Sequence, residues 1–179
     1  VPITVGGGIR KLEDIQIALN AGADKTAINT KAVQSPNFIK EASKVYGSQC
    51  IVSSIDAKKI EENRWEVYVD NGREPTGKDV AEWALEVEAL GAGEIMLTSV
   101  DKEGTKKGFD IQLNRMVSKL VSIPIISSGG AGNKIDVADV ILNSYTDAVS
   151  IASLFHYNIE SIETLKNFLN QDKNISTRL

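Results

Sequence analysis

Asp56 is the residue whose place in the sequence most strongly favours chemistry. It follows residues 51–55 (Ile-Val-Ser-Ser-Ile), a run with the β-branched, apolar composition of a buried strand. A carboxyl group at the mouth of such a strand costs free energy unless it is paired or used. General acid or base catalysis would use it. The structural alternative is an ion pair with Lys58, which is close in the sequence.

Two glycine-rich loops could bind anions. Residues 2–9 read Pro-Ile-Thr-Val-Gly-Gly-Gly-Ile, and residues 124–131 read Pro-Ile-Ile-Ser-Ser-Gly-Gly-Ala. Glycine lets backbone N–H groups turn toward a ligand, and the N-terminus of a following helix attracts a phosphate. Two such loops predict a substrate with a phosphate at each end. The alternative is that the glycines only make tight strand–helix turns.

The repeat continues beyond the loops. Residues 24–30 (Asp-Lys-Thr-Ala-Ile-Asn-Thr) correspond to residues 147–153 (Asp-Ala-Val-Ser-Ile-Ala-Ser). Each glycine loop is therefore followed by a second strand that ends in small polar residues. This pattern indicates one half-domain used twice.

Lys25 and Glu94 lie near the starts of their expected strands. Lys25 precedes Asn29 by four residues, and Glu94 precedes Thr98 by four residues. Because side chains alternate along a strand, each charged residue shares a face with its polar partner. We expect both at the N-terminal mouth of a barrel, either as a structural salt bridge or as a gate.

The remaining reactive side chains are few. The only histidine, His156, follows the last expected strand and is assigned a structural role. The only cysteine, Cys50, is expected to be a buried, inert thiol, so no disulfide is predicted. Neither a catalytic triad nor a metal site can be built around these two residues. We predict no metal and no cofactor.

Six strand-like runs alternate with helical patterns. The strands are expected at residues 3–5, 24–28, 50–55, 94–98, 123–127 and 148–152. Helices are expected at residues 11–21, 36–46, 111–121, 135–143 and 161–171, and one more after Asp79 with an apolar stripe formed by Val80, Trp83, Ala84 and Val87. This alternation predicts an α/β fold with a parallel sheet. The repeat favours a (βα)8 TIM barrel over a doubly wound sheet. About six of the eight units are present, so residues 1–179 are expected to form a single incomplete barrel domain whose first two units are missing.

Local signals mark helix starts and a decorated loop. Ser35 is expected to cap the helix that follows Pro36, and Asp79 with Glu82 resembles a capping box. Residues 65–72 predict an extra hairpin after the third strand, with an Asn-Gly turn. Such a loop at the carboxyl ends of barrel strands is typical of a lid.

Charge and composition exclude several partners. The net charge is −4, 42% of the residues are hydrophobic, and the pI is about 5.1. An acidic chain is a poor ligand for nucleic acid or for an anionic membrane. No apolar run is long enough to cross a bilayer, and a cytoplasmic protein is expected.

Seven short motifs in order resemble one known family. They are residues 5–10, 27–30, 47–50, 55–58, 75–77, 91–95 and 128–132. Together they resemble the cyclase subunit of imidazole glycerol phosphate synthase, of histidine biosynthesis, over essentially the whole chain. The sister isomerase of that pathway shares the Gly-Gly loops. The stretches at residues 98–101 and 129–132 look like the cyclase.

The resemblance implies a barrel that binds a bisphosphorylated aminoimidazole carboxamide ribonucleotide and works as a heterodimer with a glutaminase subunit. Ammonia from the glutaminase would pass through the barrel and attack the ribulosyl carbonyl, giving imidazole glycerol phosphate and a carboxamide ribotide. Asp56 would be one of two general acid–base aspartates, the other lying on a first strand that this sequence lacks.

The resemblance also implies roles for the following positions. One phosphate site would comprise Gly8, Asn29 and Thr30, and the other Gly104, Gly130, Ala152 and Ser153. Residues close to the substrate would be Thr98, Asp101, Ser128 and Gly129. Lys25 and Glu94 would belong to the charged ring at the ammonia entrance, and Asp24 would contact the glutaminase.

Two departures from the family pattern bear on the substrate. The family usually has aspartate where Glu103 stands, and residues 133–136 lack its usual Glu-His pair. In these departures the sequence resembles paralogues that deliver ammonia to a nucleotide sugar in surface-polysaccharide synthesis. A sugar-amidating paralogue and a non-catalytic barrel that only binds phosphorylated ligands are therefore the alternatives.

Overall fold

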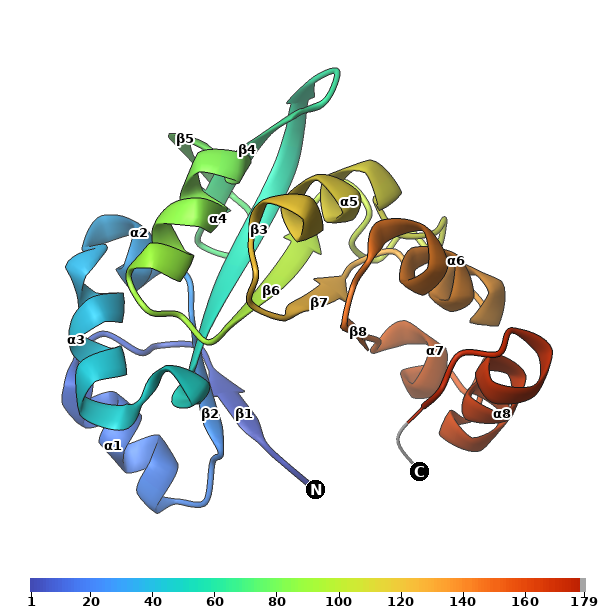
Figure 1. The fold of residues 1–179 in the computed structure, drawn as a ribbon, viewed down its shortest axis with the longest axis horizontal. Helices are drawn as coiled ribbons and strands as arrows, with labels where there is room; N and C mark the ends of the chain where they lie inside the picture. The colour runs from blue at the N-terminus through green and yellow to red at the C-terminus, as the bar shows by residue number, and fades with distance from the viewer. Residues whose placement is uncertain (178–179) are drawn as a thin grey trace.

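The computed structural model describes residues 1–177, which form one curled sheet with helices on its outer face (Figure 1). Its strands are β1 (Thr4–Gly6), β2 (Lys25–Ile28), β3 (Ile51–Glu61), β4 (Arg64–Val69), β5 (Glu74–Asp79), β6 (Glu94–Ser99), β7 (Ile125–Ser128) and β8 (Ala148–Ser150). Its helices are α1 (Leu12–Asn20), α2 (Thr30–Gln34), α3 (Asn37–Tyr46), α4 (Val80–Ala89), α5 (Ile111–Leu120), α6 (Lys134–Ser144), α7 (Ser153–His156) and α8 (Ile162–Asn167), with single turns η1 (Ser48–Cys50) and η2 (Phe168–Asp172). None of the helices in residues 1–177 is long and apolar enough to cross a membrane.

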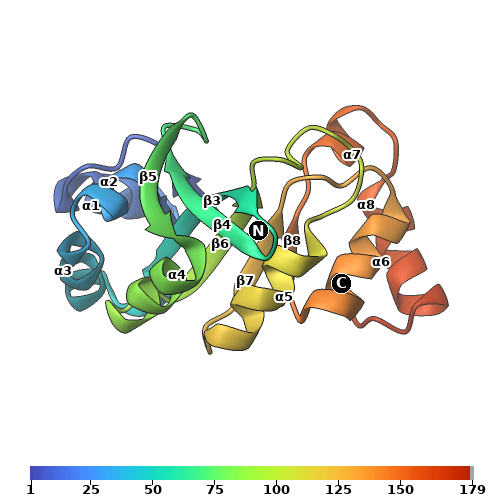
Figure 2. The same ribbon diagram turned by 90° about the horizontal axis from the view of Figure 1, so that it is seen from above.

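Six parallel strands run in the order β1-β2-β3-β6-β7-β8. Five of these strands are followed directly by a helix, whereas β3 is followed by β4 and β5 and only then by α4. The helices lie on the convex side of the sheet, as Figure 2 shows from above. The sheet curls into part of a barrel with about six βα units, which confirms the predicted TIM-barrel fold. The predicted strands agree with the observed ones to within a few residues, except β3.

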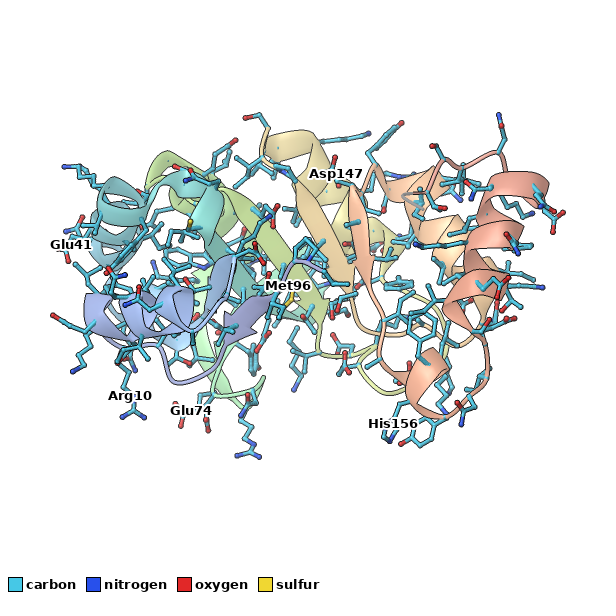
Figure 3. The ribbon with its side chains drawn as sticks, turned by 90° about the horizontal axis from the view of Figure 1, so that it is seen from below. Arg10, Glu41, Glu74, Met96, Asp147 and His156 are labelled. Atoms are coloured by element: carbon cyan, nitrogen blue, oxygen red, sulfur yellow. The ribbon has the colours of Figure 1, made fainter. Side chains whose placement is uncertain are left out.

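Alternation along the strands separates a buried outer face from a concave inner face. In β6, Ile95 and Leu97 are fully buried, whereas Glu94, Met96 and Thr98 are partly exposed. The buried set packs against helices on the convex side. Met96 lies on the concave face near the middle of the sheet (Figure 3).

Two apolar clusters hold the helices on the sheet. The larger one joins Ile28, Ile55 and Ile95 of the strands to Ile39 of α3 and Trp83 of α4. The smaller one joins α6, α7 and α8 through Val137, Leu154 and Leu165. Both clusters lie outside the sheet, so they fix the strands without filling the concave face.

The two halves of the repeat make the same hydrogen bonds. Asp24 Oδ2 accepts from the Ile3 backbone N–H at 2.7 Å, and Asp147 Oδ2 accepts from the Ile125 N–H at 2.9 Å. Each glycine loop then leads into a helix that begins with a capping box. Asp14 occupies the third position of α1, and Asp136 occupies the third position of α6. The repeat inferred from sequence is therefore present in the backbone.

Helix starts match the local signals only in part. Asp79 caps α4, since its Oδ1 accepts from the N–H groups of Ala81 and Glu82 at 2.8 and 3.3 Å. The prediction that Ser35 caps the next helix is wrong. The short helix α2 brings Lys31 beside it, and the Ser35 hydroxyl accepts from the Lys31 ammonium at 3.1 Å instead.

The extra hairpin is larger than predicted. β3 does not end at Asp56 but continues to Glu61, and β4 pairs antiparallel with this extension. The predicted Asn-Gly turn connects β4 to β5, with Asn71 and Gly72 at φ of 56° and 75°. Residues 65–72 are thus one strand and a turn within a three-stranded ribbon, rather than a complete hairpin.

Candidate functional site

Asp56 lies where β3 leaves the barrel. Its register partner on one side is Thr98 of parallel β6, and on the other side it is Tyr68 of antiparallel β4. Strand alternation places Asp56 on the same concave face as Ser54 and Met96, and all three line one cavity. The carboxylate is half-buried at the carboxyl edge of the barrel strands.

The environment of Asp56 shifts its protonation equilibrium. Burial raises the pKa of this carboxyl group, the hydrogen bond from Asn29 lowers it, and the negative charge of Glu103 raises it again. The net effect is a pKa above the usual range for aspartate. Asp56 makes no ion pair with Lys58 in the described structure, where the Lys58 ammonium lies 5.2 Å from the centre of the Tyr68 ring. The structural alternative for Asp56 is therefore wrong.

The first glycine loop and Asp56 share a cavity of about 860 Å³, which we call the first cavity. It is lined by residues 6–10, 27–31 and 54, and by Gln34, Asp56, Asp70, Asn71 and Met96. The structure thus brings Gly8, Asn29 and Thr30 together with Asp56, although the sequence separates them. Chain segments from β1, β2, β3 and the β4–β5 turn all contribute to this cavity.

A smaller second cavity lies around the second glycine loop. It is lined by residues 128–131 and 150–153 and by Glu103, Gly104 and Lys106. Six residues singled out from sequence therefore lie together here: Gly104, Ser128, Gly129, Gly130, Ala152 and Ser153. In the strand order, Asp56 of β3 lies between β1-β2 and β7-β8, the strands whose ends frame the two cavities.

The backbone of both loops requires glycine. Gly8 has a φ of 73° and Gly130 a φ of 108°, a region that other residues rarely adopt. A Cβ on Gly130 would lie 2.2 Å from the Gly108 carbonyl oxygen, whereas a Cβ on Gly8 would meet no atom within 4 Å. The first loop therefore leaves open space at its surface, and the second is pressed against the loop that precedes α5.

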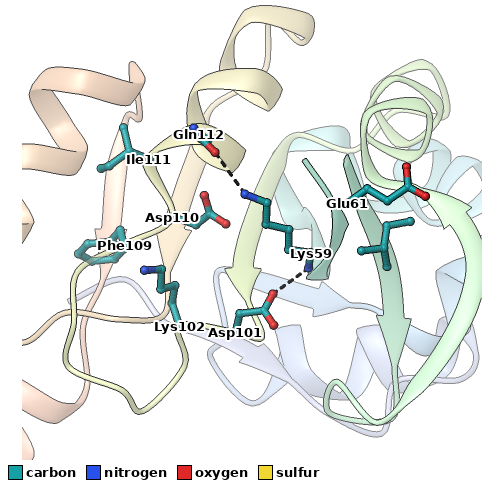
Figure 4. Close-up of a pocket in the computed structure, with 9 residues that line it drawn as sticks. Lys59, Glu61, Asp101, Lys102, Phe109, Asp110, Ile111 and Gln112 are labelled. Carbon is teal, nitrogen blue, oxygen red and sulfur yellow. Dashed lines mark hydrogen bonds between the residues drawn. The ribbon is translucent and has the colours of Figure 1, made fainter. Parts of the chain in front are cut away.

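Asp101 lies apart from both glycine cavities. Its Oδ2 accepts from the Lys59 backbone N–H at 2.7 Å, and it lines an outer cavity of about 640 Å³ between the β3 extension and α5 (Figure 4). Lys59 and Gln112 meet across this outer cavity at 3.4 Å. The predicted closeness of Asp101 to a substrate remains a prediction.

Lys25 and Glu94 form an ion pair at the opposite, amino-terminal end of the sheet. Their side chains are 30% and 21% exposed, so the pair is only partly withdrawn from solvent. Asp24, beside them, holds the Ile3 backbone. The predicted shared layer is confirmed, whereas the gate and the partner contact stay predictions.

Several residues of the first cavity were missed from sequence. Arg10, Lys31, Asp70 and Met96 all line it. The Asn-Gly turn was a usable signal for Asp70, since a lid over the barrel mouth must bring its tip to the site. His156 stacks edge-on against Tyr157 at 4.9 Å and lines neither glycine cavity.

The arrangement suits a long anionic ligand and proton transfer. Each glycine cavity contains a glycine loop and the first residue of a helix, and Asp56, whose pKa is raised, lines the first of the two. No group of three or more metal-ligating His, Cys, Asp or Glu side chains occurs among residues 1–177. Compared with known families, the sequence matches the model described as histidine biosynthesis protein over residues 1–160.

Proposed function

The chain belongs to the histidine biosynthesis protein family of TIM-barrel enzymes, and we propose that it is the cyclase subunit of imidazole glycerol phosphate synthase. In this reaction ammonia and a bisphosphorylated ribulosyl aminoimidazole carboxamide ribonucleotide give imidazole glycerol phosphate, aminoimidazole carboxamide ribotide and the water that carries away the carbonyl oxygen. The observation that carries the proposal is that Asp56 lines the first glycine cavity, while a second glycine cavity built on the same backbone plan lies beyond β6, the next strand of the sheet.

Asp56 would act as one of the two general acid–base groups of this reaction. Ammonia adds to the ribulosyl carbonyl, and the nitrogen then has to lose a proton while the departing group gains one. A carboxyl group whose pKa lies above its usual range exchanges protons more readily near neutral pH than an ordinary aspartate does. General acid–base catalysis of this kind contributes roughly 10²–10⁴-fold to the rate.

The glycine loops would hold the two phosphates. Gly8 and Thr30 would contribute to one phosphate site, and Gly130 and Ser153 to the other. Backbone N–H groups suit this role in an acidic protein because they bind an anion without a basic surface. Holding both ends of the ligand would fix the reacting carbonyl near Asp56, which is the main source of rate enhancement by positioning.

Ammonia would arrive from a glutaminase partner at the amino-terminal end of the sheet. The Lys25–Glu94 ion pair lies at that end, and the next inward-facing residue of β6 is Met96, which lines the first cavity. We assign the ion pair the role of a gate, and Asp24 that of a contact to the partner.

One observation favours a second candidate, the ammonia-channelling paralogue that amidates a nucleotide sugar. A Cβ built on Gly129 would lie 3.1 Å from Glu103 Oε2, so the Glu103 carboxylate lies against the second glycine loop. A negative charge there opposes a phosphate dianion. A substrate with one phosphate and a hydroxyl-bearing end would avoid this repulsion.

Complementation separates these candidates. The full-length gene is expressed in a histidine auxotroph that lacks the cyclase, beside a variant carrying Asp56→Asn. The cyclase proposal predicts growth without histidine for the unaltered gene and none for Asp56→Asn. A matched acid-to-amide control, Asp139→Asn on the outer helix α6, should still support growth. Failure of the unaltered gene in cells that contain the folded protein would favour the paralogue.

A further inference from the structure

The side chain of Asn29 donates a hydrogen bond to the carboxylate of Asp56. From the end of β2, its amide nitrogen donates to Asp56 Oδ2 at 3.0 Å and to the Tyr68 carbonyl oxygen of β4 at 3.3 Å. One amide therefore ties together three strands: the barrel strand β2, the strand β3 that carries the acid, and the ribbon strand β4.

The chemistry of the neighbours fixes the direction of this amide. A rotation by half a turn would bring Asn29 Oδ1 against two oxygen acceptors, the Asp56 carboxylate and the Tyr68 carbonyl. In the observed orientation Oδ1 is buried and has no hydrogen-bond partner among residues 1–177. A buried oxygen without a partner costs free energy. The observed orientation therefore keeps both hydrogen bonds of Asn29 Nδ2 and leaves Oδ1 without one.

The internal repeat shows that the backbone here does not need an amide. Asn29 corresponds to Ala152, and both residues precede a short helix, α2 or α7. Their φ angles are −115° and −111°. Alanine fills this backbone position in the second half, so the backbone conformation by itself does not require the amide.

We propose that Asn29 is a positioning residue that holds the Asp56 carboxylate in its reactive orientation, in addition to any contact its backbone makes with phosphate. This inference rests on the proposed function, because it takes Asp56 as the acid–base group. It differs from a ligand role for the Asn29 side chain, whose donor hydrogens are both directed at the protein.

The charges around Asp56 determine what loss of this amide would do. The charged groups around this carboxylate are Arg10, Lys31, Lys58, Asp70 and Glu103. Lys58 is stacked on the Tyr68 ring and Lys31 bonds Ser35, so neither pairs with Asp56. The hydrogen bond from Asn29 favours the ionised carboxylate, whereas burial and Glu103 oppose it. Removing the amide should raise the pKa of Asp56 further.

The test is the pH dependence of ammonium-driven turnover in Asn29→Ala, with Asn29→Leu as a variant of similar volume that preserves packing. We expect kcat to fall on the order of 10²-fold, KM for the bisphosphorylated substrate to change little, and the pH limb set by Asp56 to move to higher pH. The control Asn143→Ala, on the outer helix α6, should leave all three unchanged.

A substrate-free readout keeps the test independent of turnover. The carboxyl carbon of Asp56 is titrated by NMR in the unaltered protein and in both Asn29 variants, and its midpoint should move upward in the variants. A raised KM with an unchanged pH profile and midpoint would overturn the inference and make Asn29 a substrate ligand. Full turnover in Asp56→Asn would instead refute the proposed function, whatever the Asn29 variants do.

Discussion

Lys25 and Glu94 are ion-paired across the amino-terminal end of the sheet, although β3 lies between the strands that carry them. Both side chains remain partly exposed, so water reaches the pair and screens part of its attraction. An ion pair that water can reach is well placed to open and close. This relationship leads to the first prediction.

Lys25→Ala should uncouple the two sources of ammonia. With the glutaminase partner present, glutamine-dependent turnover should fall several-fold more than turnover driven by free ammonium, because only the first depends on controlled passage through the amino-terminal mouth. Paired steady-state assays measure the ratio. Lys40→Ala on the outside of α3 serves as the control. Equal proportional losses in the two assays would reject the gate.

Gly8→Ala and Gly130→Ala should differ in stability. Both glycines have positive φ, which costs another residue about 1–2 kcal/mol. At Gly130 the new Cβ also meets the Gly108 carbonyl at 2.2 Å, and such crowding adds about 1–3 kcal/mol. Urea unfolding should therefore show Gly130→Ala to be clearly the less stable variant. Equal unfolding midpoints would contradict the close packing of the second loop.

Gly8→Ala should also weaken anion binding without unfolding the protein. The added methyl group points into open space at the first cavity, where a phosphate would lie. Gly77→Ala is a matched control, since Gly77 has the same φ of 73°, equally open surroundings, and a position outside both glycine cavities. Affinity for inorganic phosphate should drop in Gly8→Ala alone. A similar drop in Gly77→Ala would assign the effect to backbone strain.

Much of the fold could be predicted because its signals are local. Strand alternation, the cap at Asp79 and the glycine pairs all depend on residues near one another in the sequence. The shared layer of Lys25 and Glu94 also followed, since strand period and parallel order fix it together.

The missed features depend on contacts between distant segments. The extension of β3 to Glu61 is polar and forms only because β4 pairs with it. The hydrogen bond from Asn29 to Asp56, and the one that Asp101 accepts from the Lys59 backbone N–H, both form only once the ribbon of β3, β4 and β5 has folded. Ser35 failed as a cap because a lysine from the short preceding helix reaches its hydroxyl first.

Asp56→Asn should make stability less dependent on pH. The pKa of Asp56 is raised in the folded state above the unfolded value of about 3.9. The folded protein therefore holds the proton more tightly, and this contribution to stability is full below the unfolded pKa and lost as pH rises through the folded pKa. The variant should gain stability relative to the unaltered protein at neutral pH, and the gain should vanish near pH 3–4.

Thermal unfolding at a series of pH values measures this difference. Asp139→Asn, an exposed acid-to-amide change, should follow the unaltered protein throughout. A gain for Asp56→Asn that is largest at low pH would mean that ionised Asp56 is stabilised by a partner in the folded state, contrary to its surroundings.

Turnover and binding in Asp56→Asn, measured side by side, test the central claim most directly. The variant is supplied with the bisphosphorylated ribonucleotide and excess ammonium, and substrate affinity is determined by calorimetry on the same preparation. A reactive acid held between two phosphate sites predicts that turnover falls at least 10²-fold while affinity stays within a few-fold. Undiminished turnover in the variant would contradict the account.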